Sequence, residues 1–152
     1  MEIPVNIRAD PKPARFELET VADLEHLDQI NVFIEQTLAA MGITGENFGH
    51  ICVSLDEAVT NVIMYAYPQE KGNVRICIEK RDGRVTFEIS DSGKPFNPLE
   101  QPVPDVSANI ENRMIGGLGI HLIRHMMDEI SYRRDNGRNY FILVKKIPGG
   151  VK

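Results

Sequence analysis

A long segment without apolar periodicity, from Ser92 to Ile115, separates two strongly patterned parts of the chain. Four of the nine prolines lie within ten residues of this segment, namely Pro95, Pro98, Pro102 and Pro104. Three glycines follow within four residues, namely Gly116, Gly117 and Gly119. Irregular connections longer than about 12–15 residues are usually functional lids or linkers. Because both flanks carry clear apolar periods, we expect a lid over residues 92–116 that lies inside one domain.

The length of the chain is consistent with a single domain. A fold of 152 residues buries roughly 68–70% of the surface that its unfolded chain exposes, so it needs no disulfide framework. We expect this domain over residues 15–148, after an N-terminal arm over residues 1–14 that contains three prolines. No secretory signal pattern and no apolar run of about 20 residues is present, which predicts a cytoplasmic protein without a membrane partner. The net charge of −5 argues against direct nucleic-acid binding.

The apolar pattern of the flanks predicts an α+β fold. Helical spacing occurs from Leu24 to Leu38, from about Glu46 to Ala66, and from Leu118 to Ile130. Alternating apolar residues indicate strands at 16–20, 74–78, 85–89, about 130–134 and about 139–146. Asp-Gly and Asn-Gly pairs at 82–83 and 136–137 are typical of hairpin turns. The predicted order is strand, two helices, hairpin, lid, helix and hairpin, with helices on one face of a mainly antiparallel sheet.

The polar side of the second predicted helix carries the first candidate site. Glu57 and Asn61 lie about 40° apart on a helical wheel, and His50 and Ser54 fall within about 60° of Glu57. A carboxylate and a carboxamide one turn apart can present a base and a metal-binding oxygen to one ligand. Taken alone, such a pair is equally typical of any solvated helix face.

Two further patterns add glycines to acidic or helical positions. Asp91 and Gly93 follow a predicted strand, which places an acceptor beside backbone that a flat ligand can approach, although a plain turn explains the pair as well. Gly116, Gly117 and Gly119 stand immediately before an amphipathic helix, whose free N–H groups suit phosphate. The glycines match neither a Walker nor a Rossmann motif, and a simple hinge remains an alternative.

The order and spacing of these three patterns resemble the N-box and the two glycine boxes of the GHKL ATPase superfamily. The stretches 55–67, 91–96 and 116–120 resemble the bacterial anti-sigma-factor serine kinases more closely, as do residues 127–132 and 137–139. The resemblance covers residues from about 15 to 146. It implies a two-layer α/β sandwich of Bergerat type that binds ATP and Mg²⁺. Tyr65 departs from the family pattern, since a histidine is frequent there, and Pro95 stands where many members have a glycine.

The resemblance also implies roles for individual residues. Glu57 would be the catalytic base that acts on a serine hydroxyl of a partner protein, and Asn61 would coordinate Mg²⁺. Asp91 would accept the adenine amino group, with Gly93 leaving room for the ring. The residues that would contact the phosphates are Gly116, Gly117, Gly119 and, on the lid, Arg113.

The resemblance implies two kinds of partner, a STAS-type anti-anti-sigma protein as substrate and a sigma factor as target, and a homodimer is consistent with it. The leading hypothesis is therefore an ATP-dependent protein-serine kinase and anti-sigma factor of a partner-switching system. A non-catalytic module that binds nucleotide and sequesters its partner is the alternative. A detached ATP-binding domain of a histidine kinase is a third reading, but no segment is left over for a hairpin bearing the acceptor histidine.

Overall fold

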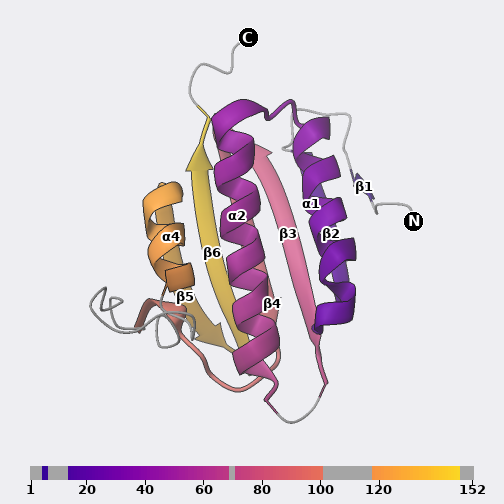
Figure 1. Cartoon of the computed structure of the whole chain (residues 1–152), viewed down its shortest axis with the longest axis vertical. Coiled ribbons are helices and arrows are strands. Elements are labelled where there is room, and N and C mark those ends of the chain that lie inside the picture. Colours follow the sequence, from indigo (N-terminus) through magenta and orange to yellow (C-terminus); the bar gives the residue numbers. More distant parts are fainter. Residues whose placement is uncertain (1–4, 7–13, 69–70, 101–117, 148–152) are drawn as a thin grey trace.

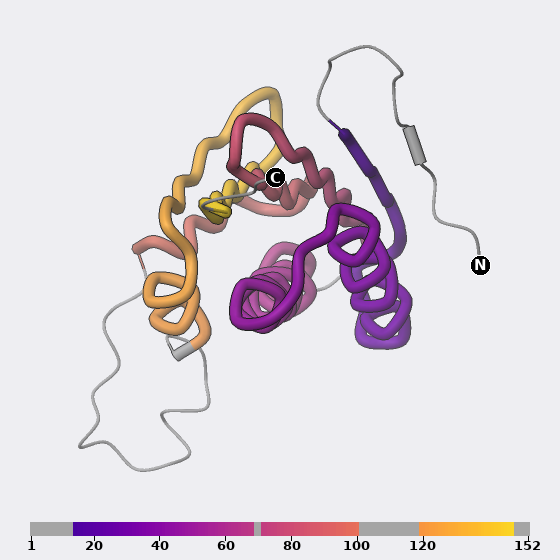
Figure 2. The backbone as a smooth tube through the Cα atoms, turned by 90° about the horizontal axis from the view of Figure 1, so that it is seen from above, coloured from indigo at the N-terminus to yellow at the C-terminus, as the bar shows by residue number. Residues whose placement is uncertain are grey.

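Three helices cover one face of a twisted antiparallel sheet in the computed structural model, which describes residues 5–6, 14–68, 71–100 and 118–147 (Figure 1). The view along the sheet shows helices α1, α2 and α4 on the same side of the strands (Figure 2). The strands are β1 (Val5–Asn6), β2 (Ala14–Val21), β3 (Asn73–Arg81), β4 (Arg84–Asp91), β5 (Glu129–Asp135) and β6 (Arg138–Lys146). The helices are η1 (Leu24–His26), α1 (Leu27–Ala40), α2 (Gly45–Asn61), η2 (Val62–Ala66), η3 (Pro98–Glu100) and α4 (Leu118–Met126). The predicted α+β two-layer architecture is confirmed.

The sheet has the strand order β1-β2-β3-β4-β6-β5, and every neighbouring pair is antiparallel. Ile78 pairs with Phe87, and Phe87 pairs in turn with Leu143, so apolar side chains stand in one row on the helix-facing side. Both predicted hairpin turns form. Asp82 and Asn136 have φ of 53° and 51°, and the glycine after each also has positive φ, as a two-residue hairpin loop requires.

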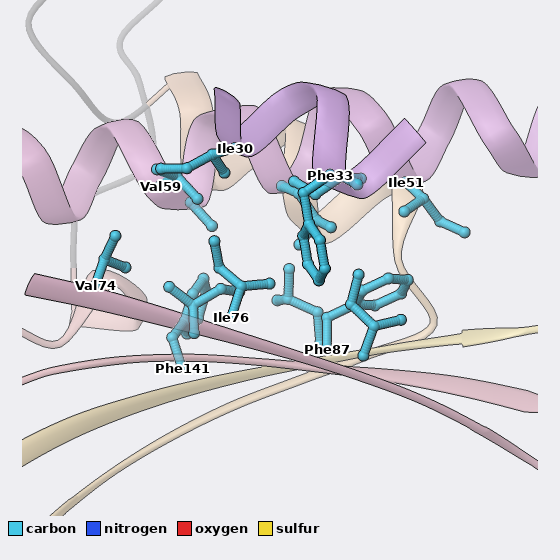
Figure 3. Packing of buried hydrophobic residues seen from close by; sticks show 14 of the residues in the cluster. Ile30, Phe33, Ile51, Val59, Val74, Ile76, Phe87 and Phe141 are labelled. Carbon is cyan, nitrogen blue, oxygen red and sulfur yellow. The ribbon is translucent and has the colours of Figure 1, made fainter. Parts of the chain in front are cut away.

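The core lies between the two layers. Ile30, Phe33, Ile51 and Val59 point from the helices toward the strands, where side chains such as Phe87 meet them (Figure 3). The helix residues recur at three- and four-residue spacing, which is the stripe that the sequence predicts. Burial of this apolar face fixes which side of α2 turns outward and therefore where the polar residues of α2 stand.

The first helical segment begins at Leu24, as predicted, but the end of the last helix differs from the prediction. The N-cap ahead of the first helix is Asp23, whose Oδ1 accepts a hydrogen bond from the His26 N–H at 3.0 Å. The last predicted helix ends at Met126, and Ile130 lies in β5. The chain leaves the helix there because the Asp128 N–H donates to the Val144 carbonyl and joins the sheet.

The second helix changes its winding after Asn61, where a π-helical turn, η2, extends it to Ala66. Such turns are rare and occur often at functional sites. No helix among the described residues is long and apolar enough to cross a bilayer.

Candidate functional site

Asp91 is a buried carboxylate at the end of β4, with 3% of its surface exposed. Its Oδ1 atom accepts hydrogen bonds from the Gly93 N–H at 2.8 Å and from Asn139 Nδ2 at 2.9 Å. No described residue donates a hydrogen bond to Oδ2. Burial raises the pKa of the Asp91 carboxyl, and the hydrogen bonds from Asn139 and Gly93 partly offset that effect.

Asn139, on the neighbouring strand β6, holds this region together. Its Nδ2 donates to Asp91 and, at 2.8 Å, to the Lys94 carbonyl. Its Oδ1 accepts from Tyr132 Oη at 2.5 Å and from Arg134 Nη1 at 3.0 Å. Because Asn139 is itself buried, this single amide fixes both the Asp91 carboxylate and the loop that follows it.

Gly93 lies directly against the end of the second helix. A Cβ at this position would stand 2.2 Å from the Ala66 carbonyl oxygen, and the next residue, Lys94, donates its N–H to that same oxygen at 3.0 Å. The space beside Gly93 is therefore filled by the protein's own backbone. Only glycine allows the loop after β4 to approach η2 so closely.

Two tyrosines from the second helix and the residue after it contact the same loop. The Tyr65 ring stacks on Phe96 with 5.1 Å between centroids. Tyr67 Oη accepts from the Ser92 N–H and donates to the Asn73 carbonyl, both at 2.8 Å. The loop is thus held by the helix on one side and by β6 on the other.

Glu57 stands on the outward side of α2, two and a half turns before Ala66. A Cβ on Gly119, in the first turn of α4, would lie 2.5 Å from Glu57 Oε1. The absence of a side chain at Gly119 therefore lets α4 pack against this carboxylate. Burial, and secondarily the Asp56 carboxylate, raises the pKa of Glu57. No described residue forms a hydrogen bond with its oxygens.

Asn61 is the last residue of α2, one turn beyond Glu57, and its side chain is half-exposed. The helix therefore brings together both predicted polar residues and touches both glycine segments, Gly119 at Glu57 and Gly93 at Ala66. An amide oxygen with no described partner fits one position of a magnesium shell that water and phosphate oxygens complete. Among the described residues, no group of three metal-binding side chains exists that could hold an ion alone.

Comparison with known families decides the classification. The model of the histidine kinase-like ATPase domain matches residues 20–145, which include all the elements that build this site. The chain belongs to this family.

The relatives of this histidine kinase-like ATPase domain include two proteins named serine-protein kinase RsbW. One is from Bacillus thuringiensis (strain Al Hakam) and one from Bacillus anthracis (strain CDC 684 / NRRL 3495), and each is 27% identical over 127 residues. Each alignment covers 81% of this chain and 79% of the relative.

Structural comparison gives the same fold. The crystal structure of the RsbU and RsbW domains of a Mycobacterium tuberculosis protein superposes with a TM-score of 0.63 at 15% identity. That match covers 87% of this chain but 32% of the longer one, so the chain spans about a third of it.

Not every predicted site residue lies where its side chain can be described. Arg113, Gly116 and Gly117 fall outside the described residues, and their predicted phosphate contacts stay predictions. Ser54, which the helical wheel places near Glu57, is fully buried in the ATPase domain, and its Oγ has no described hydrogen-bond partner. His50 bonds with Lys145 Nζ at 3.2 Å.

The sequence patterns indicate no role for Asn139, although its side chain makes more hydrogen bonds than that of any predicted site residue. A short polar residue in register with the apolar residues Phe141 and Leu143 of the same strand is the pattern that indicates it. In the sequence, Tyr65 is only a departure from the family pattern, whereas the structure gives that ring a stacking partner.

Proposed function

We propose that this chain is an ATP-dependent protein-serine kinase and anti-sigma factor of a partner-switching system, and that it phosphorylates a serine of a STAS-type anti-anti-sigma protein. The observation that carries the proposal is Glu57, a half-buried carboxylate with a raised pKa and no described hydrogen-bond partner, beside the first turn of α4. A carboxylate that is available and less acidic than usual suits a general base. The serine-protein kinase name of the two Bacillus relatives supports the same assignment.

The other end of the site suits the adenine of ATP. Asp91 Oδ2 accepts from the exocyclic amino group, while Asn139 and the Gly93 N–H keep the carboxylate in place through Oδ1. Tyr65 and Phe96 form an aromatic pair on the same loop. Because these internal hydrogen bonds already hold the side chains in place, few of them need to be ordered when adenine binds.

Asn61 would hold Mg²⁺, and the ion would supply the charge neutralisation that a polyphosphate needs beside the acidic residues of an acidic protein. The first turn of α4 lies against Glu57 at Gly119, and the start of a helix offers free N–H groups and the positive end of a dipole to phosphate. Gly116, Gly117 and Arg113 contribute further phosphate contacts.

In the transfer step the serine Oγ of the partner forms a bond to the γ-phosphorus while the bond from that phosphorus to the β,γ-bridging oxygen breaks. ADP leaves with the bridging oxygen, and the hydroxyl proton passes to the Glu57 carboxylate. The chain mainly positions the groups and stabilises charge, as phosphoryl transfer requires. Nucleotide state and substrate phosphorylation then decide whether the chain holds the sigma factor or the anti-anti-sigma protein.

A transfer assay with two variants tests this proposal. STAS-domain proteins encoded in the same genome are purified and incubated with the chain, Mg²⁺ and γ-phosphate-labelled ATP. Glu57→Ala is expected to bind nucleotide like the parent but to lose transfer by about 10²–10⁴-fold. Asn61→Ala is expected to lose both in Mg²⁺. Glu46→Ala, which removes an exposed carboxylate from the first turn of the same helix, is the matched control and should retain transfer.

Each other result has a defined meaning. Transfer by Glu57→Ala at the parental rate would overturn the catalytic assignment. Tight binding of a STAS partner without phosphoserine would support the non-catalytic module instead. Calorimetric titration with Mg·ATP and Mg·ADP tests both readings, since no binding at millimolar nucleotide contradicts the kinase and the module alike.

A further inference from the structure

We propose that His121 and His125 form a two-imidazole site for a divalent transition-metal ion on the outer face of α4. The two residues lie one helical turn apart, and their Nε2 atoms stand 3.2 Å from each other. The rings meet edge to face, at 84°, with 4.5 Å between centroids. Both nitrogens therefore converge on one region of space.

The separation of the nitrogens fits a metal ion bound to both. Zinc binds imidazole nitrogen at about 2.0–2.1 Å, so tetrahedral ligands stand about 3.3 Å apart and ligands at a right angle about 2.9 Å apart. The observed 3.2 Å falls between these values. The spacing of the two nitrogens thus fits a shared ion once the rings turn from their mutual hydrogen bond toward it, and water completes its shell on the solvent side.

The pair differs from the other two histidines of the chain. His26 Nδ1 is bonded to the Asp23 carboxylate at 2.6 Å, and His50 is bonded to Lys145. Among the described residues, the His121 and His125 side chains have a polar contact only with each other. His125 is exposed and His121 is half-exposed, so solvent ions reach both.

The donor atoms also define the class of ion. Imidazole nitrogen suits Zn²⁺, Cu²⁺ and Ni²⁺, whereas Mg²⁺ prefers oxygen. This site is therefore distinct from the magnesium position assigned to Asn61. Without metal, one Nε2 carries a proton and donates to the other. On binding, that proton moves to Nδ1 of the same ring through solvent, and both Nε2 lone pairs go to the ion without oxidation or reduction.

A bound ion would link the two turns of a short helix. α4 has nine residues, and helices of that length are marginal without tertiary support. Its first turn contains Gly119, which packs on Glu57. The ion would therefore stabilise the element that stands beside Glu57, through two residues that follow Gly119 on the same helix.

Zinc titration of the tag-free full chain, in the absence of nucleotide and partner, tests this site. We expect one equivalent of Zn²⁺ to bind by calorimetry, and the unfolding midpoint to rise by about 2–4 °C at saturation. Mg²⁺ at the same concentration should give neither effect. His121→Gln and His125→Gln should each weaken Zn²⁺ binding at least tenfold, whereas His26→Gln, which removes an imidazole elsewhere, should leave it unchanged.

Equal Zn²⁺ affinity in the parent and in His121→Gln would overturn the proposal, because the ion would then bind elsewhere. No binding by the parent would overturn it as well. A Cu²⁺ titration followed by electron paramagnetic resonance provides a second readout, in which the parent should show coupling to two nitrogens and each variant to fewer. None of these results depends on kinase activity, so the proposed function is tested separately.

Discussion

The two carboxylates of the site, Asp91 and Glu57, are held in opposite ways. Asp91 is almost wholly buried, and its Oδ1 accepts two hydrogen bonds from within the domain. Glu57 is half-buried on the outer side of α2, and no described residue donates to it. Burial raises the pKa of both, but only Asp91 has hydrogen bonds that offset this effect.

This contrast fits the proposed division of roles, in which Asp91 binds the nucleotide and Glu57 takes part in phosphate transfer. A carboxylate fixed through one oxygen presents the other in a constant direction, which suits recognition of a flat base. A carboxylate held only by packing can rotate to meet a hydroxyl brought by another protein. The Asp91 side of the site is therefore formed by the fold itself. The Glu57 side would be completed only when the ligand and the partner protein bind.

The largest effect on stability is expected where the fixed end is held. Asn139→Ala removes the donor to the buried Asp91 carboxylate, and with it the part-buried hydrogen bonds to the Lys94 carbonyl and from Tyr132. We expect the free energy of unfolding to fall by about 2–4 kcal/mol, measured by urea denaturation. Asn73→Ala removes an exposed amide with one 3.3 Å contact and should change it by less than about 0.5 kcal/mol. Similar losses in both variants would contradict the role of Asn139.

A smaller effect is expected when the fixed carboxylate becomes an amide. In Asp91→Asn the side-chain oxygen can still accept from Gly93 and Asn139, but an NH₂ group then replaces the open Oδ2. That group would face the adenine amino group as a second donor. We expect ATP affinity to fall about 10- to 150-fold, the range for a hydrogen bond to a charged group, measured by calorimetry. Unchanged affinity would place the adenine elsewhere.

Two glycine substitutions sharpen the contrast in packing. Gly93→Ala drives a Cβ against the Ala66 carbonyl at 2.2 Å, and because backbone must shift, we expect a loss of about 1–3 kcal/mol of stability.

Gly119→Ala meets only Glu57 Oε1, the end of a flexible side chain, at 2.5 Å. Its stability should stay within about 1 kcal/mol of the parent, while the displaced Glu57 lowers phosphate transfer. Chemical denaturation and the transfer assay together decide this, and a reversed order of stabilities would refute it.

The smallest effect concerns pH. The raised pKa of Asp91 means that the folded chain holds this proton more tightly than the unfolded chain, where the pKa is about 3.9. Ionisation of Asp91 therefore lowers stability as pH rises from about 4 through the native pKa, and above it the cost is complete. Each pH unit of that window contributes about 1.4 kcal/mol at most. As pH rises through this range, urea denaturation should show the free energy of unfolding of the parent falling relative to that of Asp91→Asn. A constant difference would contradict the prediction.

Most of the fold follows from apolar periodicity. The stripe at Ile51, Leu55 and Val59 and the alternation at Val74, Ile76 and Ile78 are simple consequences of packing one layer on another. The end of α4 does not follow, because Met127 and Ile130 continue the helical period by chance while the Asp128 N–H bonds to the neighbouring strand.

The candidate site also has features that the sequence predicts and features that it does not. Glu57, Asn61, Asp91 and Gly93 follow from the motifs, and the structure places them along one helix and the loop that touches it. The function of Gly93 as a contact for Ala66 does not, because it depends on two segments far apart in sequence. Ser54 is buried because α2 places it beside Ile51 and Ala58, at the edge of the apolar stripe, although the wheel also sets it within about 60° of Glu57.

The π-helical turn at Val62–Ala66 acts as a change of phase in the second helix. The angle per residue changes after Asn61, so a regular helical wheel does not predict the direction of the side chains that follow. The direction of Tyr65 is therefore not fixed by that of Glu57. Removing one residue from this turn would restore regular winding and rotate Tyr65 and the Ala66 carbonyl away from Phe96 and Gly93. The loop after β4 would then lose its support, while Glu57 would stay in place.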